Sequence, residues 1–410
     1  MLLHTGTFDV ENYGDLLFPA LLQRRFPQDE IIHVSPAGSL SLWNDTVPCR
    51  PLDTAAGLPA RALVIGGGNI LQAMPTTLPF YRRAAVDLTG YADLWIVPTL
   101  SAPPEMPVIW NAPGVPGYFE TPFIPIVREA VLRADYLAVR DVESREMISE
   151  IAPNRHVRVV PDPAWELPAL WPATSHASAL QATLARLGAG PDTRFFVTHV
   201  NRRYISDLEP AQLADEIDGL AAAFEARPLL AAIGPCHGDT GTARQVAHTL
   251  RSDPLVLASP RSLHEMAALI AGAVAYVGSS MHGYITAAAY GVPAIVIARG
   301  KPKFDGVLRL TKAPESGLTS WSGVADHVRG LDLAALSTRF LKAQTQAAAT
   351  LDQHWGEIAM LVATGPLTGG LDPRKVGDAR IRVLTALVRQ FQERLTEGEE
   401  IIARAASTIP

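Results

Sequence analysis

The sequence contains few cysteines and no excess of positive charge. Its 410 residues include only Cys49 and Cys236, which lie far apart and have no partners at the spacing of metal ligands. The sequence therefore predicts neither a disulfide framework nor a zinc site, and we expect reduced thiols and no bound metal. The formal net charge of −6 argues against a nucleic-acid-binding surface. An anionic ligand would have to bind at a local cluster of cations.

Long hydrophobic runs and a targeting segment are also missing. Residues 264–299 are strongly apolar, but His282, two glycine-containing turns and Pro293 interrupt them before they reach a membrane-spanning length. The first residues, MLLHTGTFDVENYGD, have no basic segment followed by a long hydrophobic stretch. We therefore expect a cytoplasmic protein without a signal peptide or a transmembrane segment.

Composition and periodicity predict a globular α/β protein. About half of the residues are hydrophobic (48%) and 19% are charged, which excludes a disordered chain, and the length suggests two or three domains. Short apolar strands alternate with helical patterns in two series, over residues 1–160 and 195–298, and we expect one of these strands at residues 94–97. This order predicts two doubly wound parallel sheets with helices on both faces.

The predicted domains follow from the position of these two series. We expect an N-terminal Rossmann-like domain over residues 1–175 and a second Rossmann-like domain over residues 190–345. The proline-rich residues 163–190 are the expected linker. Residues 346–410 form a predicted helical extension, whose amphipathic helix at 378–406 suggests packing or oligomerisation rather than chemistry.

The segment YVGSSMHGYITAAAYGVPAIVI, at residues 276–297, is the clearest candidate for a ligand site. It is predicted to form a strand, a turn, a helix and a second strand. In such a unit the first N–H groups of the helix are unpaired and point into the crevice beyond the strand, where they can bind an anion. We predict that His282 lies beside this anion, together with Ser279, Ser280 and Gly283.

Basic residues follow three other strands of the second series. Arg202 and Arg203 follow one strand, His237 follows the next, and Arg299 and Lys303 follow the last. Each residue alone is typical of a solvated loop, and His237 could equally be a satisfied polar residue. Because parallel strands end at the same edge of a sheet, their joint placement predicts a cationic rim.

The first series contributes two strand-to-helix turns, the NYGD segment at residues 12–15 and the GGGN segment at residues 66–69. Both turns bring backbone close to a ligand, and the candidate residues are Asn12, Asp15, Gly67, Gly68 and Asn69. The GGGN turn lacks the features of a dinucleotide or Walker motif, so by itself it does not predict a nucleotide site. Asp15 could instead be only a favourable acid at a helix N-terminus.

Arg140 and Asp162 follow the last two strands of the first series. Both are expected to point toward the cleft between the domains. They could belong to the ligand site or form a salt bridge at a hinge, and the sequence leaves both interpretations open.

Five motifs occur in order along the chain: NYGD at 12–15, VIGGGNIL at 64–71, AVRDVES at 138–144, VVPDPA at 159–164 and GSSMHGYITAAAYGVPAIVI at 278–297. Together they resemble the polysaccharide pyruvyl transferase family, over about residues 1–310. The resemblance implies a GT-B-like arrangement of two Rossmann-like domains facing each other across a cleft. It also implies transfer of a pyruvyl ketal from phosphoenolpyruvate to a sugar of an exopolysaccharide or cell-wall polymer.

The resemblance assigns the histidine of the family to His282 and its arginine-aspartate pair to Arg140 and Asp141. Many members of the family carry an arginine at the position of Ser280. In this chain Arg202, Arg203 or Lys303 could replace that cation.

The chemistry of ketal formation suggests roles for the candidates. The reaction needs a cationic clamp for phosphate and carboxylate, and a general acid that protonates the enol carbon. Arg202, Arg203 and Lys303 could form the clamp, and His282 could orient the donor or deliver the proton. Asp15 or Asp162 could accept the proton of the sugar hydroxyl.

No cofactor is expected besides the donor substrate. The glycan acceptor could be lipid-linked, which would place the protein at the inner face of the membrane, and the chain could form a homo-oligomer.

Two alternative functions remain open from the sequence. The first is a GT-B glycosyltransferase or epimerase that uses a nucleotide sugar. Such an enzyme would favour an acidic ribose partner and an aromatic base platform at the second rim, where this chain has basic residues. The second alternative is a noncatalytic relative that binds a glycan.

Overall fold

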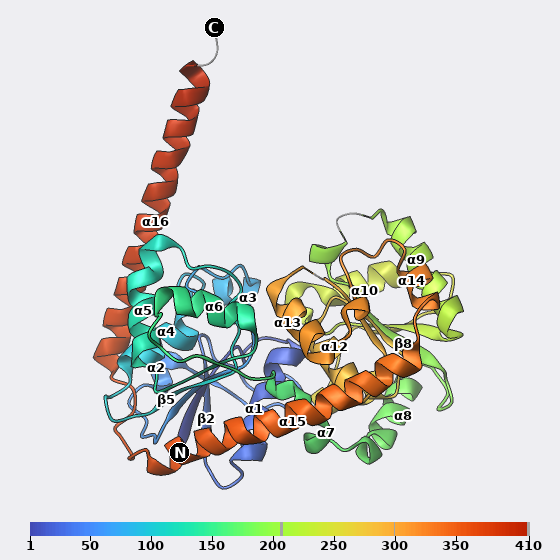
Figure 1. The fold of residues 1–410 in the computed structure, drawn as a ribbon, viewed down its shortest axis with the longest axis horizontal. Helices are drawn as coiled ribbons and strands as arrows, with labels where there is room; N and C mark the ends of the chain where they lie inside the picture. Colours follow the sequence, from blue (N-terminus) through green and yellow to red (C-terminus); the bar gives the residue numbers. More distant parts are fainter. Residues whose placement is uncertain (206–207, 299, 408–410) are drawn as a thin grey trace.

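The chain forms two parallel sheets covered by helices on both faces (Figure 1). The computed structural model describes residues 1–205, 208–298 and 300–407. The first sheet has seven strands in the order β3-β2-β1-β4-β5-β6-β7, and the second has six in the order β10-β9-β8-β11-β12-β13. The expected fold class is therefore confirmed: two Rossmann-like, doubly wound domains face each other in a GT-B-like arrangement and are followed by C-terminal helices.

The first domain begins with a central strand that is buried on both faces. In β1 the residues Leu2 and Leu3 have no exposed surface, and Leu3 pairs with Ile32 on one side and Leu63 on the other. The strands are β1 (Leu2–Thr5), β2 (Ile31–Ser35), β3 (Arg50–Pro51), β4 (Leu63–Gly66), β5 (Val108–Asn111), β6 (Tyr136–Val139) and β7 (Arg158–Val159). The helices are α1 (Tyr13–Arg25), α2 (Leu52–Ala55), α3 (Pro79–Arg83), α4 (Ala92–Ser101), α5 (Ile124–Arg133) and α6 (Val142–Ile151), with a 3-10 turn η1 (Thr121–Phe123).

The second domain repeats this plan around β8. Its strands are β8 (Phe195–His199), β9 (Arg227–Ala231), β10 (Leu255–Leu257), β11 (Tyr276–Gly278), β12 (Ala294–Ile297) and β13 (Gly317–Leu318). Its helices are α8 (His176–Arg186), α9 (Pro210–Phe224), α10 (Asp239–Ala247), α11 (Leu263–Ala271), α12 (Met281–Ala289), α13 (Pro302–Thr311) and α14 (Val324–Arg329). The short 3-10 turns are η3 (Ala173–Ser175), η4 (Arg202–Tyr204), η5 (Pro235–His237) and η6 (Pro314–Ser316).

One expected strand is wrong. Residues 94–97 lie in helix α4, and every residue from Ala92 to Thr99 is buried. A helix that is buried on all sides has no polar face, so a short apolar run does not distinguish it from a buried strand. The long C-terminal helix α16 (Pro373–Ser407) covers α4 and removes the need for such a face.

The segment expected to link the domains is folded. It forms the 3-10 turn η2 (Pro163–Glu166), the helix α7 (Leu167–Leu170), η3 and α8. Trp165 and Leu167 are fully buried, and α8 packs against α11 of the second domain. The proline residues therefore start short helices here rather than produce an extended linker. The exact domain boundaries stay a prediction.

Helix α1 joins the two hydrophobic cores. Its residues Tyr13, Leu17 and Phe18 belong to the same buried cluster as the side chains of α11 and α12. Tyr13 lies 3.0 Å from Thr286 of α12 through their hydroxyl oxygens, and its backbone N–H donates to Ile233 O (2.9 Å). The first helix of one domain therefore packs as a core element of the other.

Helix α15 (Leu333–Thr364) runs along both domains (Figure 1). It packs against α12 and α13, and further along it reaches the first sheet, where His354 lies 2.8 Å from the hydroxyl of Tyr136 and 2.9 Å from Asn111 Oδ1. The next residue, Trp355, donates from its indole N–H to Glu166 Oε2 (3.0 Å). The chain then returns to the first domain as α16, which contains the amphipathic helix expected at residues 378–406. None of the helices in the described part of the chain has both the length and the apolarity of a membrane span.

We expect Glu166→Ala to destabilise the protein. The Glu166 side chain is 2% exposed and accepts from both Arg25 (Nε, 3.1 Å) and Trp355, so its removal leaves the buried indole N–H of Trp355 without a partner and Arg25 with its exposed salt bridge to Asp352 (2.7 Å). The free energy of unfolding should fall by about 2–4 kcal/mol in urea denaturation. The matched control is Glu357→Ala on α15, which removes a half-exposed salt bridge to Arg158 and should cost at most about 1 kcal/mol. Equal effects of the two substitutions would contradict this account.

Candidate active site in the interdomain cleft

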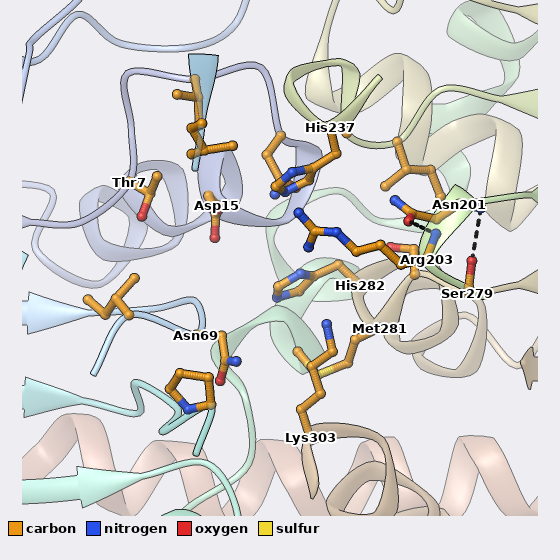
Figure 2. A pocket seen from close by; sticks show the side chains of 18 of the residues that line it. Thr7, Asp15, Asn69, Asn201, Arg203, His237, Ser279, Met281, His282 and Lys303 are labelled. Atoms are coloured by element: carbon orange, nitrogen blue, oxygen red, sulfur yellow. Dashed lines mark hydrogen bonds between the residues drawn. The ribbon is translucent and has the colours of Figure 1, made fainter. Parts of the chain in front are cut away.

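A polar cavity lies between the carboxyl ends of the two sheets (Figure 2). Its volume is about 500 Å³, and both domains line it. Ten of the predicted site residues are on its wall: Asn12, Asp15, Asn69, Arg140, Arg203, His237, Ser279, Ser280, His282 and Lys303. The structure thus brings together residues that are up to 291 positions apart in the sequence, between Asn12 and Lys303.

His282 lies where the two domains touch. It is the second residue of α12, and its ring packs edge-on against Phe18 of α1 at 5.7 Å between centroids. A Cβ atom on Gly14 would lie 1.8 Å from His282 Nδ1, so only glycine at position 14 permits this approach. His282 Nε2 lies 3.4 Å from Asp162 Oδ2. The predicted central residue is therefore held by groups of the opposite domain.

The residues that flank His282 shape the turn. Ser280 is the N-cap of α12, and its hydroxyl accepts from the backbone N–H of Gly283 (3.2 Å). The Ser279 hydroxyl accepts from Asn201 N (3.2 Å). At Gly283 a Cβ atom would lie 2.5 Å from the Tyr276 ring, so this glycine serves packing and does not line the cavity. Ser280 therefore supplies a helix cap at the position where the resemblance implied a cation.

Positive charge in the cavity comes from Arg203, Lys303 and Arg140. Figure 2 shows the side chains of Arg203, in η4, and Lys303, at the start of α13, directed toward His282. Burial, together with Arg140 and Arg203, lowers the pKa of Lys303 to about 8. Arg140 is almost completely buried and donates to Asp162 Oδ2 and Asn69 Oδ1, each at 3.1 Å. The cluster supplies the local positive charge that the net charge of the chain does not.

One predicted cation, Arg202, does not contribute to the cavity wall. Arg202 is exposed and donates to Gln245 Oε1 (2.6 Å), away from the cavity that its neighbour Arg203 lines. A 3-10 turn follows β8, and in this turn adjacent side chains point in different directions. Arg299 lies outside the described residues.

The carboxylates Asp15 and Asp162 differ in their charge state. Burial raises the pKa of Asp15 to about 6, although His282, Arg140 and Lys303 act in the opposite direction. Burial also acts on Asp162, but the charges of His282 and Arg140 lower the pKa of this group to about 2. Asp162 lies beneath the cavity wall, where it also accepts from Ala164 N (3.0 Å). One carboxyl can exchange a proton near neutral pH, and the other stays ionised.

The two glycine-containing turns of the first domain support Asp15. Gly68 has φ +76°, and a Cβ atom there would lie 2.6 Å from Asp15 Oδ1. A Cβ atom on Gly67 would lie 2.0 Å from the ring of Phe18. Asn12 is the N-cap of α1 and accepts from Gly14 N (3.2 Å). These residues therefore bring the GGGN turn against the start of α1 and so position Asp15 and Asn69.

Sequence reasoning did not select His199, Asn201 and Asp239, which also line the cavity. His199 Nε2 and Asp239 Oδ2 lie 2.7 Å apart, and Asn201 Nδ2 donates to Asp239 Oδ1 (3.1 Å). His199 and Asn201 lie at the carboxyl end of β8, as Arg203 does, so the expectation that residues at strand ends line the site applies to them as well. No pattern in the sequence predicts that they contact Asp239, at the start of α10.

His237 lines the same side of the cavity. Burial and the charge of Arg203 lower the pKa of His237 to about 4, so its ring is neutral at physiological pH. It can therefore offer hydrogen bonds to a ligand but no positive charge. Among the described residues, no group of three or more histidine, cysteine, aspartate or glutamate side chains is arranged to hold a metal ion.

Comparisons with known proteins agree with the ordered motifs. The profile of the polysaccharide pyruvyl transferase family matches residues 12–301, which is more than half of the chain. A comparison with curated protein sequences gave no significant match.

Several solved structures are similar to this chain. The wall teichoic acid polymerase TagF is 12% identical with a TM-score of 0.48, and the match covers 88% of each chain. α,α-Trehalose 6-phosphate synthase from Burkholderia multivorans is 10% identical with a TM-score of 0.41, over 95% of this chain and 98% of that one. UDP-GlcNAc 2-epimerase from Neisseria meningitidis is 13% identical with a TM-score of 0.39, over 80% and 76%.

The opposite pKa shifts of Asp15 and Asp162 predict opposite effects on stability. The ionised Asp15 is disfavoured in the folded state, so the free energy of unfolding decreases as the pH rises from about 4 to above 6. Asp15→Asn should therefore raise the melting temperature at pH 7, and the gain should shrink at pH 4. The ionised Asp162 is favoured in the folded state, and this stability is lost as the pH falls through about 4 toward 2. Asp162→Asn should lower the melting temperature at pH 7, and shifts of the same sign for both variants would refute the assignment.

Proposed function

Because the chain belongs to the polysaccharide pyruvyl transferase family, we propose that it transfers the pyruvyl group of phosphoenolpyruvate to a sugar of a glycan as a ketal. The observation that carries this proposal is the cluster of Arg203, Lys303 and Arg140 around His282 in one interdomain cavity. Phosphoenolpyruvate carries a phosphate and a carboxylate on three carbons, so a compact donor of this kind requires several cations at short range. The chain as a whole is acidic, which makes a local cluster of this kind informative.

The first half of the reaction needs a proton donor and a clamp. A proton is added to the methylene carbon of phosphoenolpyruvate, and a sugar hydroxyl attacks the neighbouring carbon and loses its own proton. We assign His282 to the protonation or to orientation of the donor, because it projects between the two cations. Arg203 and Lys303 bind the phosphate and the carboxylate, and in the second half they stabilise the negative charge of the departing phosphate.

The second half releases phosphate and closes the ketal. The bond between the former enol carbon and the phosphate oxygen breaks, a second hydroxyl of the same sugar attacks the cationic carbon, and its proton is lost. Asp15 is suited to accept a hydroxyl proton, since its pKa of about 6 permits proton exchange near neutral pH. Asp162 is better suited to positioning, because it is ionised, buried and in contact with both Arg140 and His282.

The two walls of the cavity suggest where each substrate binds. The second domain provides Arg203, His237, His282 and Lys303, and we place the donor there. The first domain provides Asp15, Asn12 and Asn69, which suit the hydroxyls of a sugar, and its Arg140 adds a cation beside the donor. We propose an exopolysaccharide or cell-wall glycan as the acceptor and a cytoplasmic location, at the inner membrane face if the acceptor is lipid-linked. The proposal requires no cofactor besides the donor.

The direct test is an assay of phosphate release from phosphoenolpyruvate with candidate glycan acceptors. We expect acceptor-dependent release by the wild type and a loss of about 10²- to 10⁴-fold in kcat for His282→Ala, the range for removal of an acid–base group. His248→Ala, at an exposed position of the second domain, is the matched control and should keep full activity. Binding of a nucleotide sugar without any release of phosphate from phosphoenolpyruvate would reject the proposal.

The neighbouring arginines provide a sharper comparison. Arg203→Ala removes a cation from the cavity wall and should raise KM for phosphoenolpyruvate by about 10- to 100-fold, as expected for the loss of a charge-assisted hydrogen bond. Arg202→Ala removes the neighbouring arginine, whose side chain points away from the cavity. This change should alter KM by less than about twofold. If the two variants have equal kinetic constants, Arg203 does not bind the donor.

A further inference from the structure

Helix α16 extends beyond the body of the protein (Figure 1). Its first half packs against α4 and η1 through Val376, Ala379, Val383 and Leu387. After Gln390 the described side chains up to Glu399 are exposed, and Arg394 in this stretch reaches back to the body through an exposed salt bridge to Glu120 (2.9 Å). A single helix in water is only marginally stable, so a partner for this half would be expected.

A second apolar face runs along α16, and its exposed residues recur at a regular spacing. Ile381, Val388 and Leu395 are 63%, 55% and 69% exposed and lie seven residues apart. Phe391 follows Val388 by three residues and is 50% exposed, whereas Leu384, three residues after Ile381, is half-buried against the core of the first domain. These are the a and d positions of a heptad repeat; the sequence continues the a positions with Ile402, and the next d position is Gly398. We call the exposed residues Ile381, Val388, Phe391 and Leu395 the heptad seam.

The heptad seam is distinct from the face that packs on the first domain. Val383 and Gln390, which are buried against the body, each follow an a position by two residues. Each residue turns a helix by about 100°, so these side chains lie on the opposite side from the seam. Packing against α4 therefore leaves the seam free to contact another helix.

We propose that the heptad seam pairs with the same seam of a second copy of this chain in a parallel coiled coil. The seven-residue spacing is what a left-handed coiled coil requires, and β-branched residues at the a positions 381 and 388 favour two strands. The charges beside the seam agree with this orientation. Arg394 occupies a g position and Glu399 the e position five residues later, so in a parallel pair in register each arginine can exchange its exposed salt bridge to Glu120 for one to the glutamate of the other copy.

The charge of the helix argues against a membrane surface as the partner. Residues 381–399 contain three arginines and three glutamates. Helices that lie on membranes are rich in lysine and arginine on their polar face, which attracts anionic lipids. A balanced set of charges instead suits pairing between identical helices.

The mass of the full-length chain in solution tests the proposal. Sedimentation equilibrium at micromolar concentration should give twice the mass of one chain for the wild type and the mass of one chain for Leu395→Glu. The matched control is Thr396→Glu, the next residue, which is exposed but outside the seam and should stay dimeric. Both positions lie beyond the body, so circular dichroism should give unchanged melting of the two domains. A monomeric wild type, or a dimer that persists in Leu395→Glu, would overturn the proposal.

Cysteine cross-linking tests the parallel register. Val388→Cys and Leu395→Cys, made separately, should each give a disulfide-linked dimer under mild oxidation, because a parallel pair brings every a position to its own copy. Thr396→Cys should not cross-link. An antiparallel pair would bring at most one of positions 388 and 395 close to itself, so cross-linking at only one of them rejects the parallel arrangement. Flotation of a monomeric protein with anionic vesicles would instead indicate a membrane-binding helix.

Discussion

The site depends on one close contact, where the ring of His282 lies against the start of α1. Position 14 must be glycine for this contact, since any side chain would occupy the space of the imidazole. The same helix contributes Tyr13 and Phe18 to the core around α12, so the contact is supported by burial on both sides. Because α1 and α12 each begin at the carboxyl end of a central strand, fixing them together also brings the functional ends of both sheets to one cavity.

The electrostatics of the cavity follow from this arrangement. The cavity and its wall hold five charged groups close together, Arg140, Arg203, Lys303, Asp15 and Asp162, so their ionisation states depend on each other. Asp162 lies beneath the cations and remains a carboxylate, whereas Asp15 is desolvated and holds its proton to a higher pH. The pKa of Lys303 is lowered, whereas that of Asp15 is raised, because burial and positive neighbours both favour the neutral amine. The buried Asp15 and Lys303 destabilise the folded state, and such groups are typical of sites that transfer protons and bind anions.

The C-terminal helices connect this site to the rest of the molecule. Helix α15 contacts α12 and α13 of the second domain and, through His354 and Trp355, the sheet and η2 of the first. It therefore limits the relative movement of the walls that carry donor and acceptor groups. Helix α16 then stabilises the first domain on one face and leaves a regular apolar seam on the other. In a dimer formed by that seam, each active site would lie within a single chain, since the seam is on α16 and the cavity is lined by the two sheets.

The sequence by itself determined the alternation of strands and helices, the strand ends and the ordered motifs, because strand length, glycine turns and apolar periodicity are local properties. These features were sufficient to place His282, Arg203 and Lys303 at one rim. Only the tertiary structure distinguished Arg203 from Arg202, since the direction of a side chain depends on the geometry of its turn. It also decided that residues 94–97 form a helix and that His199 pairs with Asp239. The reason is the same in each case: burial on all sides of an element and contacts between distant segments leave no periodic pattern in the chain, whereas burial of one face does.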